Sequence, residues 1–454
     1  MAVTSVPQLL RETDRFRHVM TVLAKYGLAP WLRHVNISWI QRLFRDAEGQ
    51  QLSEMTTEER VRSAIVELGT TFIKLGQILS TRADIIGPEL AEELARLRAS
   101  VPADPPEVAR AMIEKELGRP IEELFDEFEP QAMASASIGQ VHRARLKDGT
   151  AVVVKVQHPE IEKLIKIDLD IVKRLAELAE RHSLTLRRFQ PVKIAAEFSR
   201  TLLYELDFRR EQRNMRQFLR RFSRDKTVKF AKPFPEFCTQ RVLTMELLEG
   251  ICIGDAGGLT AAGVELNQIT ERGAKIFLEM IFRDGFFHAD PHPGNLLILP
   301  DQRIGILDCG MVGRIEQQLR DDIEDMLLSV ISGNSRRLVR AVEQLGSLPQ
   351  DMDEHQLHSD IEQFVSEYTN QKMKDFDLSG ALREMIAIIR RHSILLPASI
   401  TMLIKVLIML EGTSRMLQPE FSLAELLTPY RLSTLRRRLS PQRILGQLEN
   451  QYHD

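Results

Sequence analysis

Cysteine is scarce in this chain of 454 residues, which contains only Cys238, Cys252 and Cys309. Three dispersed cysteines cannot supply a disulfide framework, and they lack the paired spacing of a zinc site. The N-terminal residues contain no apolar core of a secretory signal peptide. These absences favour a reducing compartment that faces the cytoplasm.

A strong net charge and a long apolar run are also lacking. The formal charge is −3, with 43% hydrophobic and 28% charged residues, so nothing favours whole-protein binding of nucleic acid. The most apolar stretch begins at Ile394 and contains Pro397 and Lys405. A membrane-spanning helix needs roughly 20 nearly uncharged apolar residues. We interpret the stretch as a buried helix.

Hydrophobic periodicity predicts a helical N-terminal region over residues 1–105. Ile65, Leu68 and Phe72 belong to an apolar series with helical spacing, and Gly87–Pro88 is the predicted end of that helix. A second long helical stretch is expected over about 158–222.

Strand signals are confined to short segments. Alternating β-branched runs around Asp148–Gly149 predict a hairpin, and the apolar runs on either side of residues 299–303 predict another. We therefore expect an α+β fold in three parts: a helical extension (1–105), a strand-rich lobe with inserted helices (106–248) and a mostly helical lobe (249–454).

Two features of the strand-rich lobe suit a bound phosphate. Lys155 ends a VVVK strand, which fixes the direction of its side chain. The preceding loop is rich in small residues that let backbone N–H groups approach phosphate oxygens; they are Ala134, Ser135, Ala136, Ser137 and Gly139. Taken singly, the polar face of a half-buried strand and an ordinary turn remain open alternatives.

Two glutamates lie close together in the segment RTLLYELDFRREQ. On one continuous helix, Glu205 and Glu211 would point about 120° apart and would face different partners. Without buried lysines nearby, they would instead form a solvated charged face.

Three further residues match the metal and catalytic loops of kinases. Asp290 and Asn295 have the spacing of the Asp-x-x-x-x-Asn catalytic loop, and Asp308 begins an Asp-x-Gly element. Oxygen ligands of this kind suit Mg²⁺ together with phosphate oxygens. The ordered set of Lys155, Glu211 and these three residues favours a kinase-like nucleotide site over chance.

The chain resembles the UbiB family of atypical protein-kinase-like (ABC1-type) proteins, which is linked to ubiquinone biosynthesis. The resemblance covers nearly the whole chain. It rests on KLGQ (74–77), ASASIGQVH, VVVKVQHP, ELDFRRE, FFHADPHPGN and LDCGMVG. The Lys-x-Gly-Gln signature is absent from ordinary kinases.

The resemblance implies a role for each matching residue. Lys155 would contact the ATP or ADP phosphates and pair with Glu211, while Asn295 and Asp308 would hold Mg²⁺ and Asp290 would be the catalytic aspartate. The nucleotide would lie between two lobes. Its adenine would meet the linker at Met245–Leu248, chiefly Glu246 and Leu248, and its phosphates the loop of Ala134, Ser135, Ala136 and Ser137. Lys74 and Gln77 would cover the site as regulatory residues, with Lys74 meeting Glu205.

The sequence departs from protein kinases at two places. His292 stands where they usually have a lysine, and a helical pattern follows LDCGMVG without room for an activation loop. We therefore expect an enzyme, either an ATPase or a kinase with a small or lipid-like acceptor. A nucleotide-gated lipid-binding or scaffold protein is the alternative, and a true protein kinase ranks below both.

The expected partners are an adenine nucleotide, a quinone precursor or isoprenoid lipid, and enzymes of quinone biosynthesis. Peripheral contact with the inner membrane would use the basic amphipathic stretch from Phe16 or the cluster Arg436–Arg438. Helices that pack on the protein core are the open alternative for both segments.

Overall fold

The computed structural model describes residues 6–28, 55–97, 101–331, 333–349, 352–369 and 376–427. The chain divides into two compact units. Unit 1 comprises residues 1–220 and 231–248, and unit 2 comprises 221–230 and 249–454. Arg436–Arg438 lies outside the described residues.

Unit 1 contains a five-stranded antiparallel sheet in the order β1-β3-β4-β6, with β2 paired to β3. The β3–β4 hairpin predicted at Asp148–Gly149 is confirmed. Gly149 has a φ of +86°, which glycine adopts readily, and the Thr150 N–H donates to Asp148 Oδ1 at 2.9 Å. The strands are β1 (Phe125–Phe128), β2 (Ala134–Ser135), β3 (Gly139–Leu146), β4 (Ala151–Gln157) and β6 (Val242–Glu246).

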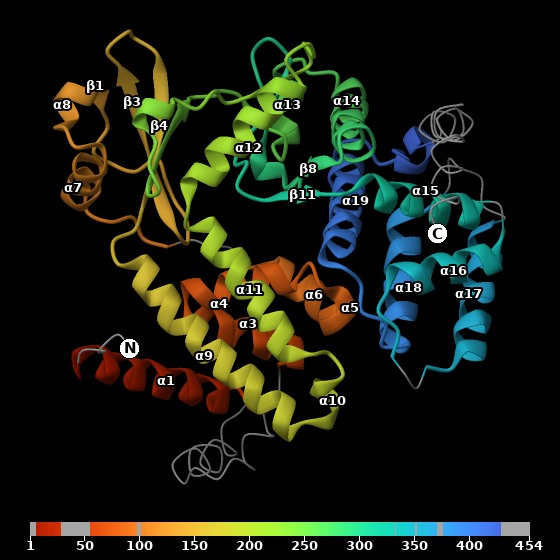
Figure 1. Cartoon of the computed structure of the whole chain (residues 1–454). Coiled ribbons are helices and arrows are strands. Elements are labelled where there is room, and N and C mark those ends of the chain that lie inside the picture. Colours follow the sequence, from red (N-terminus) through yellow and green to blue (C-terminus); the bar gives the residue numbers. More distant parts are fainter. Residues whose placement is uncertain are drawn as a thin grey trace, which may run out of the picture. The chain divides into compact units, whose positions relative to one another are not determined.

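In the described part of unit 1, the helices line two apolar clusters. Val152, Val154 and Val242 of the sheet pack with Ile113 of α7 and Leu124 of α8, and these helices lie beside the sheet in Figure 1. The described helices are α1 (Val6–Lys25), α3 (Thr57–Leu68), α4 (Thr70–Leu79), α5 (Ala83–Ile86), α6 (Pro88–Ala95), α7 (Pro106–Leu117), α8 (Ile121–Leu124), α9 (Ile161–His182), α10 (Leu184–Arg187), α11 (Pro191–Glu205) and α12 (Phe208–Arg221), with a short 3-10 turn at Pro235–Phe237.

The second cluster joins α1 to α3, α4, α6 and α9. Val19 and Val22 of α1 are almost fully buried there, beside Phe72 and Ile171. Burying a valine side chain stabilises the folded state by about 1.5–3 kcal/mol, so this face of α1 belongs to the core of unit 1. The finding favours core packing over membrane contact for this part of the stretch from Phe16.

Two local predictions are wrong. The predicted helix through Ile65, Leu68 and Phe72 is interrupted at Gly69, whose φ is +88°. The stretch 158–222 is four helices, so Glu205 and Glu211 lie on α11 and α12 rather than on one helix.

Among the described residues, unit 2 contains two small sheets, one of which includes the predicted second hairpin. β9 pairs with β10 antiparallel in the sheet β5-β10-β9-β7, and β8 pairs with β11 in the other. The strands are β5 (Val228–Phe230), β7 (Ile251–Cys252), β8 (Phe286–His288), β9 (Leu296–Ile298), β10 (Ile304–Ile306) and β11 (Val312–Arg314).

The apolar stretch from Ile394 forms the buried helix α19, which begins at Ala398, directly after Pro397. Among the described residues, none of the helices has the length and apolar character required to cross a membrane. The described helices of unit 2 are α13 (Ala256–Ala261), α14 (Leu266–Leu278), α15 (Gln317–Ile331), α16 (Ser335–Leu345), α17 (Glu354–Thr369), α18 (Leu378–Arg391) and α19 (Ala398–Leu417). Glu279–Arg283 and Pro293–Asn295 form short π and 3-10 turns.

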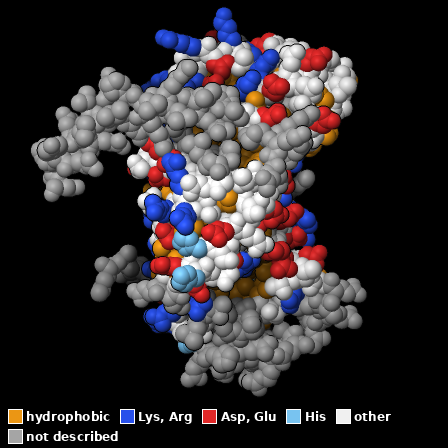
Figure 2. All heavy atoms as spheres, turned by 90° about the vertical axis from the view of Figure 1, so that its right-hand side faces the viewer, with side chains coloured by type: hydrophobic (Ala, Val, Ile, Leu, Met, Phe, Trp, Pro, Cys, Tyr) orange, Lys and Arg blue, Asp and Glu red, His pale blue; other side chains and the backbone are white. Residues whose placement is uncertain are grey.

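Acidic and basic side chains are interspersed on the described part of the face shown in Figure 2. This mixture agrees with the small net charge of the chain. Such a surface produces little long-range attraction for a charged partner.

A buried carboxylate joins α17 to α18 and makes the stability of unit 2 depend on pH. Asp360 lies 2.7 Å from Arg391 and 2.9 Å from His392. Burial opposes its ionisation, but hydrogen bonds from His392, Arg391 and Gln356 outweigh burial and lower the pKa of Asp360 to about 2.

A lowered pKa stabilises the folded state above the unfolded pKa of 3.8, and this stabilisation is lost as pH falls toward about 2. We expect Asp360→Asn to cost about 2 kcal/mol at pH 6. The difference from wild type should shrink from pH 4 downward in thermal unfolding. A difference that stays constant from pH 6 to pH 3 would contradict this assignment.

Candidate functional site

Lys155 and Glu211 form an ion pair inside unit 1. Lys155 is on β4 and Glu211 is in the first turn of α12, and Lys155 Nζ lies 2.9 Å from Glu211 Oε2. The exposed fractions are 18% for the lysine side chain and 5% for the glutamate. The Lys155 ammonium also lies over the Phe208 ring, 5.1 Å from its centroid. The predicted contact is therefore present, in a partly desolvated setting that strengthens it.

The loop of small residues is a tight connection between β2 and β3. The Ala136 N–H donates to Gly139 O at 2.9 Å, and a Cβ at Gly139 would lie 2.3 Å from Val156 O. Ala134 and Ala136 are exposed, Ser135 is half-buried and Ser137 is buried. Gly139 is needed because the β4 backbone approaches so closely.

Two residues that the sequence reasoning missed hold this region. Gln157 is the last residue of the strand of Lys155, and His158 directly follows it. The His158 ring contacts Asp104 Oδ2 at 2.6 Å and Ala136 O at 2.8 Å, which ties the loop to the linker before α7. The signal was a pair of polar residues at the end of an apolar strand.

The Lys-x-Gly-Gln motif lies on α4 in unit 1. Lys74 Nζ is 2.8 Å from Glu205 Oε2, so this predicted contact is present as well. Gln77 instead donates from Nε2 to Leu97 O at 3.1 Å. Each glutamate thus meets its own lysine, although the two glutamates lie on separate helices.

The segment predicted to meet adenine comprises the end of β6 and the two residues that follow it. The Glu246 N–H donates to Lys232 O at 2.8 Å, and the Leu247 N–H donates to Ala151 O at 3.1 Å. Leu248 is buried and is the last residue of unit 1.

Asp290 and Asn295 come together in unit 2, on the loop between β8 and β9. Asn295 Nδ2 donates to Asp290 Oδ2 at 3.0 Å and to Asp290 O at 3.2 Å. Because the amide nitrogen of Asn295 faces Asp290, its Oδ1 is the atom suited to a metal ion.

His288 connects this loop to the turn that carries Asp308. The ring is buried; Nδ1 accepts from the Asp290 N–H at 3.2 Å, and Nε2 donates to Asp308 O at 2.9 Å. These contacts require a neutral ring with its proton on Nε2. The His288 ring therefore holds the backbone of both loops.

Asp308 is exposed and has a φ of +45°, a left-handed conformation that is uncommon outside glycine. Its Oδ1 accepts from the Gly310 N–H at 3.0 Å. Cys309 is buried, which agrees with an unreactive thiol. The exposed ring of His292 is oriented by the Gly294 N–H, which donates to its Nδ1 at 3.0 Å.

The described residues contain no group of three or more His, Cys, Asp or Glu side chains that could hold a metal ion. A metal on Asn295 and Asp308 would need phosphate or water oxygens as its other ligands, which is how Mg²⁺ is commonly bound.

The fold and the order of these elements define a kinase-like protein. Residues 96–342 match the ABC1 atypical kinase-like domain, and residues 361–422 match the UbiB helical domain. The chain belongs to the UbiB family of ABC1-type atypical kinase-like proteins, and its kinase-like α+β fold class is as predicted.

Relatives match almost the full length of the chain. It is 33% identical to "Probable protein kinase UbiB" of Pseudomonas aeruginosa strain LESB58, over 99% of this chain and 85% of that protein. It is also 33% identical to the protein of that name from Tolumonas auensis, over 96% and 81%. A solved structure, the Rv3197–erythromycin complex from Mycobacterium tuberculosis, shares 22% identity at a TM-score of 0.47, over 74% of this chain and 92% of that one. The identity and the TM-score are both too low for this structure to support the family assignment.

Proposed function

We propose that this chain is an Mg²⁺-dependent atypical kinase or ATPase that binds ATP or ADP and supports the biosynthesis of ubiquinone or another isoprenoid lipid. The observation that carries the proposal is the ion pair of Lys155 with Glu211. In protein kinases a strand lysine paired with a helix glutamate holds the nucleotide phosphates.

Lys155 would contact the α and β phosphates, with Glu211 fixing its direction. The loop Ala134–Ser137 would cover the phosphates, and the end of β6 with the two residues that follow it, Glu246–Leu248, would meet adenine. The close approach of Gly139 to β4 supports this arrangement, because it keeps the loop beside the strand of Lys155.

Asn295 and Asp308 would hold Mg²⁺ through oxygen atoms, which are the ligands this ion prefers. When bound, the ion would neutralise charge on the phosphate oxygens. The contacts of His288 with both loops support the assignment, since they fix the backbone on which the two ligands stand.

In the hydrolytic reaction, Asp290 would orient a water molecule toward the γ-phosphorus. The water oxygen forms a bond to phosphorus while the bond to the β–γ bridging oxygen breaks, giving ADP, phosphate and a proton that leaves to solvent. Positioning and charge neutralisation supply the rate enhancement. In the kinase reaction, a hydroxyl oxygen of the acceptor takes the place of water.

A peptide acceptor is disfavoured by the chain that follows Asp308. β11 ends at Arg314 and α15 begins at Gln317, so little chain is available to form a platform for a peptide. A small or lipid-like acceptor fits better, such as a quinone precursor. Quinone-biosynthesis enzymes and the inner membrane would be its surroundings.

The contact of Lys74 with Glu205 favours regulation, and it also suits the alternative of a nucleotide-gated lipid-binding protein with little turnover. Phosphate release from Mg-ATP, with and without liposomes that contain a quinone-like phenol, tests the proposal. Wild type should release phosphate, and Lys74→Ala should raise the rate without lipid about fivefold, by freeing Glu205.

Lys25→Ala is the matched control, because Lys25 forms an exposed ion pair with Glu67 in the same unit. This variant should behave as wild type. Equal rates in wild type and Lys74→Ala would remove the regulatory role. Tight nucleotide binding without phosphate release, together with extraction of lipid from vesicles, would favour the lipid-binding alternative.

A further inference from the structure

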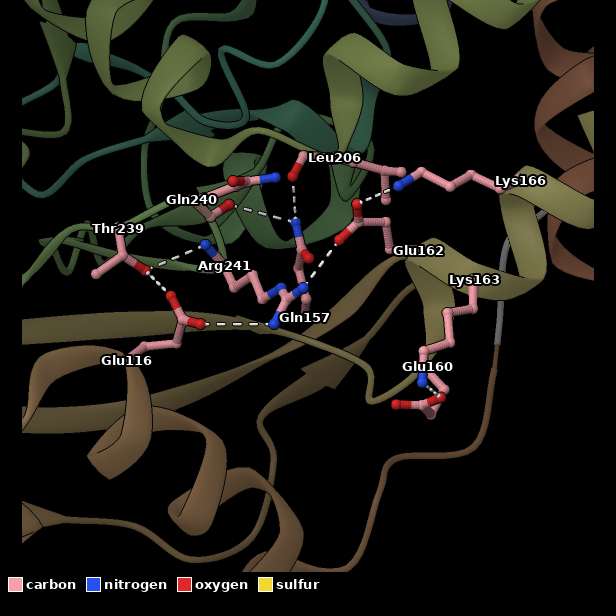
Figure 3. A network of polar contacts seen from close by, with 10 residues as sticks. All are labelled: Glu116, Gln157, Glu160, Glu162, Lys163, Lys166, Leu206, Thr239, Gln240 and Arg241. Atoms are coloured by element: carbon pink, nitrogen blue, oxygen red, sulfur yellow. Dashed lines mark hydrogen bonds and ion pairs between the residues drawn. The ribbon is translucent and has the colours of Figure 1, made fainter. Parts of the chain in front are cut away.

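Gln157 is buried at the end of the strand that carries Lys155. Its side chain is 3% exposed, and its Nε2 donates to Leu206 O at 2.6 Å and to Gln240 O at 3.4 Å. Figure 3 shows this amide pointing at both carbonyl groups. One side chain thus joins the end of β4 to two other segments of unit 1.

The first of these segments is the joint between α11 and α12, where Leu206 and Asp207 separate the two helices. The second is Gln240, just before β6, and its carbonyl also accepts from the Phe208 N–H at 3.0 Å. Leu206, which follows α11, is therefore bonded to Gln157, and Phe208, which begins α12, is bonded to Gln240.

The segment before β6 is itself fixed on its outer side. The Gln157 N–H donates to Arg241 O at 3.0 Å, and the Arg241 guanidinium contacts Glu162 of α9 at 2.9 Å. Thr239 donates to Glu116 of α7 at 2.7 Å (Figure 3). The segment before β6 is thus fixed by contacts with α7 and α9. A movement of the joint between α11 and α12 would break its hydrogen bonds to Gln157 and Gln240.

The two glutamates of the candidate site lie on either side of the joint. Glu205 is the last residue of α11 and pairs with Lys74, and Glu211 is in the first turn of α12 and pairs with Lys155. Burial opposes ionisation of Asp207 in the joint, but hydrogen bonds from Arg209 outweigh it and lower the pKa of Asp207. A rotation at the joint would move the two glutamates together.

We propose that Gln157 is a positioning residue that clamps the joint between α11 and α12 and thereby couples the Lys74–Glu205 ion pair to the Lys155–Glu211 ion pair. The expected effect of Gln157 on nucleotide binding rests on the proposed function, whereas the coupling between the two ion pairs does not. Removing the amide donors leaves the buried Leu206 carbonyl without this partner, which is costly in a protein interior.

The clamp is tested by amide hydrogen exchange on the full-length protein without nucleotide. Gln157→Met keeps the length of the side chain and removes both donors. We expect the amides of residues 208–211 to exchange about tenfold faster, since loss of one buried hydrogen bond shifts local opening by about that factor. Lys163→Gln is the control, because Lys163 and Glu160 form an exposed pair in the same network, and it should match wild type.

Coupling is separated from a merely structural role by a double-mutant cycle. Lys74→Ala should raise exchange of residues 208–211 when Gln157 is present, and should add nothing in the Gln157→Met background. Additive effects would overturn the coupling, as would unchanged exchange in Gln157→Met. If Gln157→Met does not fold, Gln157→Asn, which is one methylene too short to reach Leu206, takes its place in the same cycle.

Nucleotide binding is measured on the same proteins by titration with ADP. Weaker binding by Gln157→Met than by Lys163→Gln supports the clamp. If none of these proteins, the wild type included, binds ADP, the proposed function is wrong. The hydrogen-exchange cycle still tests the role of Gln157 in that case.

Discussion

Asp308→Asn is expected to lower Mg²⁺-dependent nucleotide turnover about 10²–10³-fold, because it removes a negative ligand oxygen at a site where charge develops in the reaction. The change is nearly isosteric. Its amide oxygen can still accept from the Gly310 N–H, so the turn should keep its shape. Phosphate release at saturating Mg-ATP is the measurement, and raising the Mg²⁺ concentration should recover part of the rate.

Asp301→Asn is the matched control for this substitution. Asp301 lies in the turn of the β9–β10 hairpin, is half exposed and pairs with Arg303. The control should keep the wild-type rate. Turnover in Asp308→Asn equal to that of wild type would show that Asp308 does not hold the metal.

Lys155→Met is expected to destabilise unit 1 even without nucleotide. Glu211 is only 5% exposed, so removing its cation leaves a buried carboxylate without this ion pair. Breaking a buried pair in this way costs about 3 kcal/mol, which corresponds to a fall of about 6–12 °C in the thermal unfolding midpoint of a unit of this size. Adding Glu211→Gln to the variant should recover much of the loss, because the buried charge is then gone.

Lys166→Met provides the comparison on an exposed pair. Lys166 contacts Glu162 on the surface of α9 with 60% of its side chain exposed, and such pairs contribute little to stability. The unfolding midpoint should then stay within about 2 °C of wild type. Equal midpoints for Lys155→Met and Lys166→Met would mean that the Lys155–Glu211 pair is not a buried ion pair in solution.

The sequence predicted those features that depend on local signals. The hairpin at Asp148–Gly149 follows from turn chemistry, and the buried helix from Ile394 follows from apolar composition interrupted by Pro397. The order of motifs singled out Lys155 and Glu211, and the family resemblance implied that they pair. The roles of these residues, and the three-part division of the chain, remain predictions.

Other features depend on contacts between distant segments. Nothing in the segment LYELDF breaks a helix, because it contains neither proline nor glycine, yet α11 ends at Glu205. The break is held by Gln157 and Gln240, which are 49 and 34 residues away from Leu206 in the sequence. Helical periodicity has no access to such contacts. The assumption of one continuous helix therefore failed, although the expectation of two separate lysine partners held.

The central claim is that Lys155 belongs to an adenine-nucleotide site that depends on Mg²⁺. The most direct test is calorimetric titration of the full-length protein with ADP, with and without Mg²⁺, for wild type and Lys155→Arg, which keeps a cation for Glu211. Binding by wild type that strengthens with Mg²⁺ and weakens at least about tenfold in Lys155→Arg is the predicted result. Equal binding by the two proteins, or wild-type binding that is indifferent to Mg²⁺, would contradict the account.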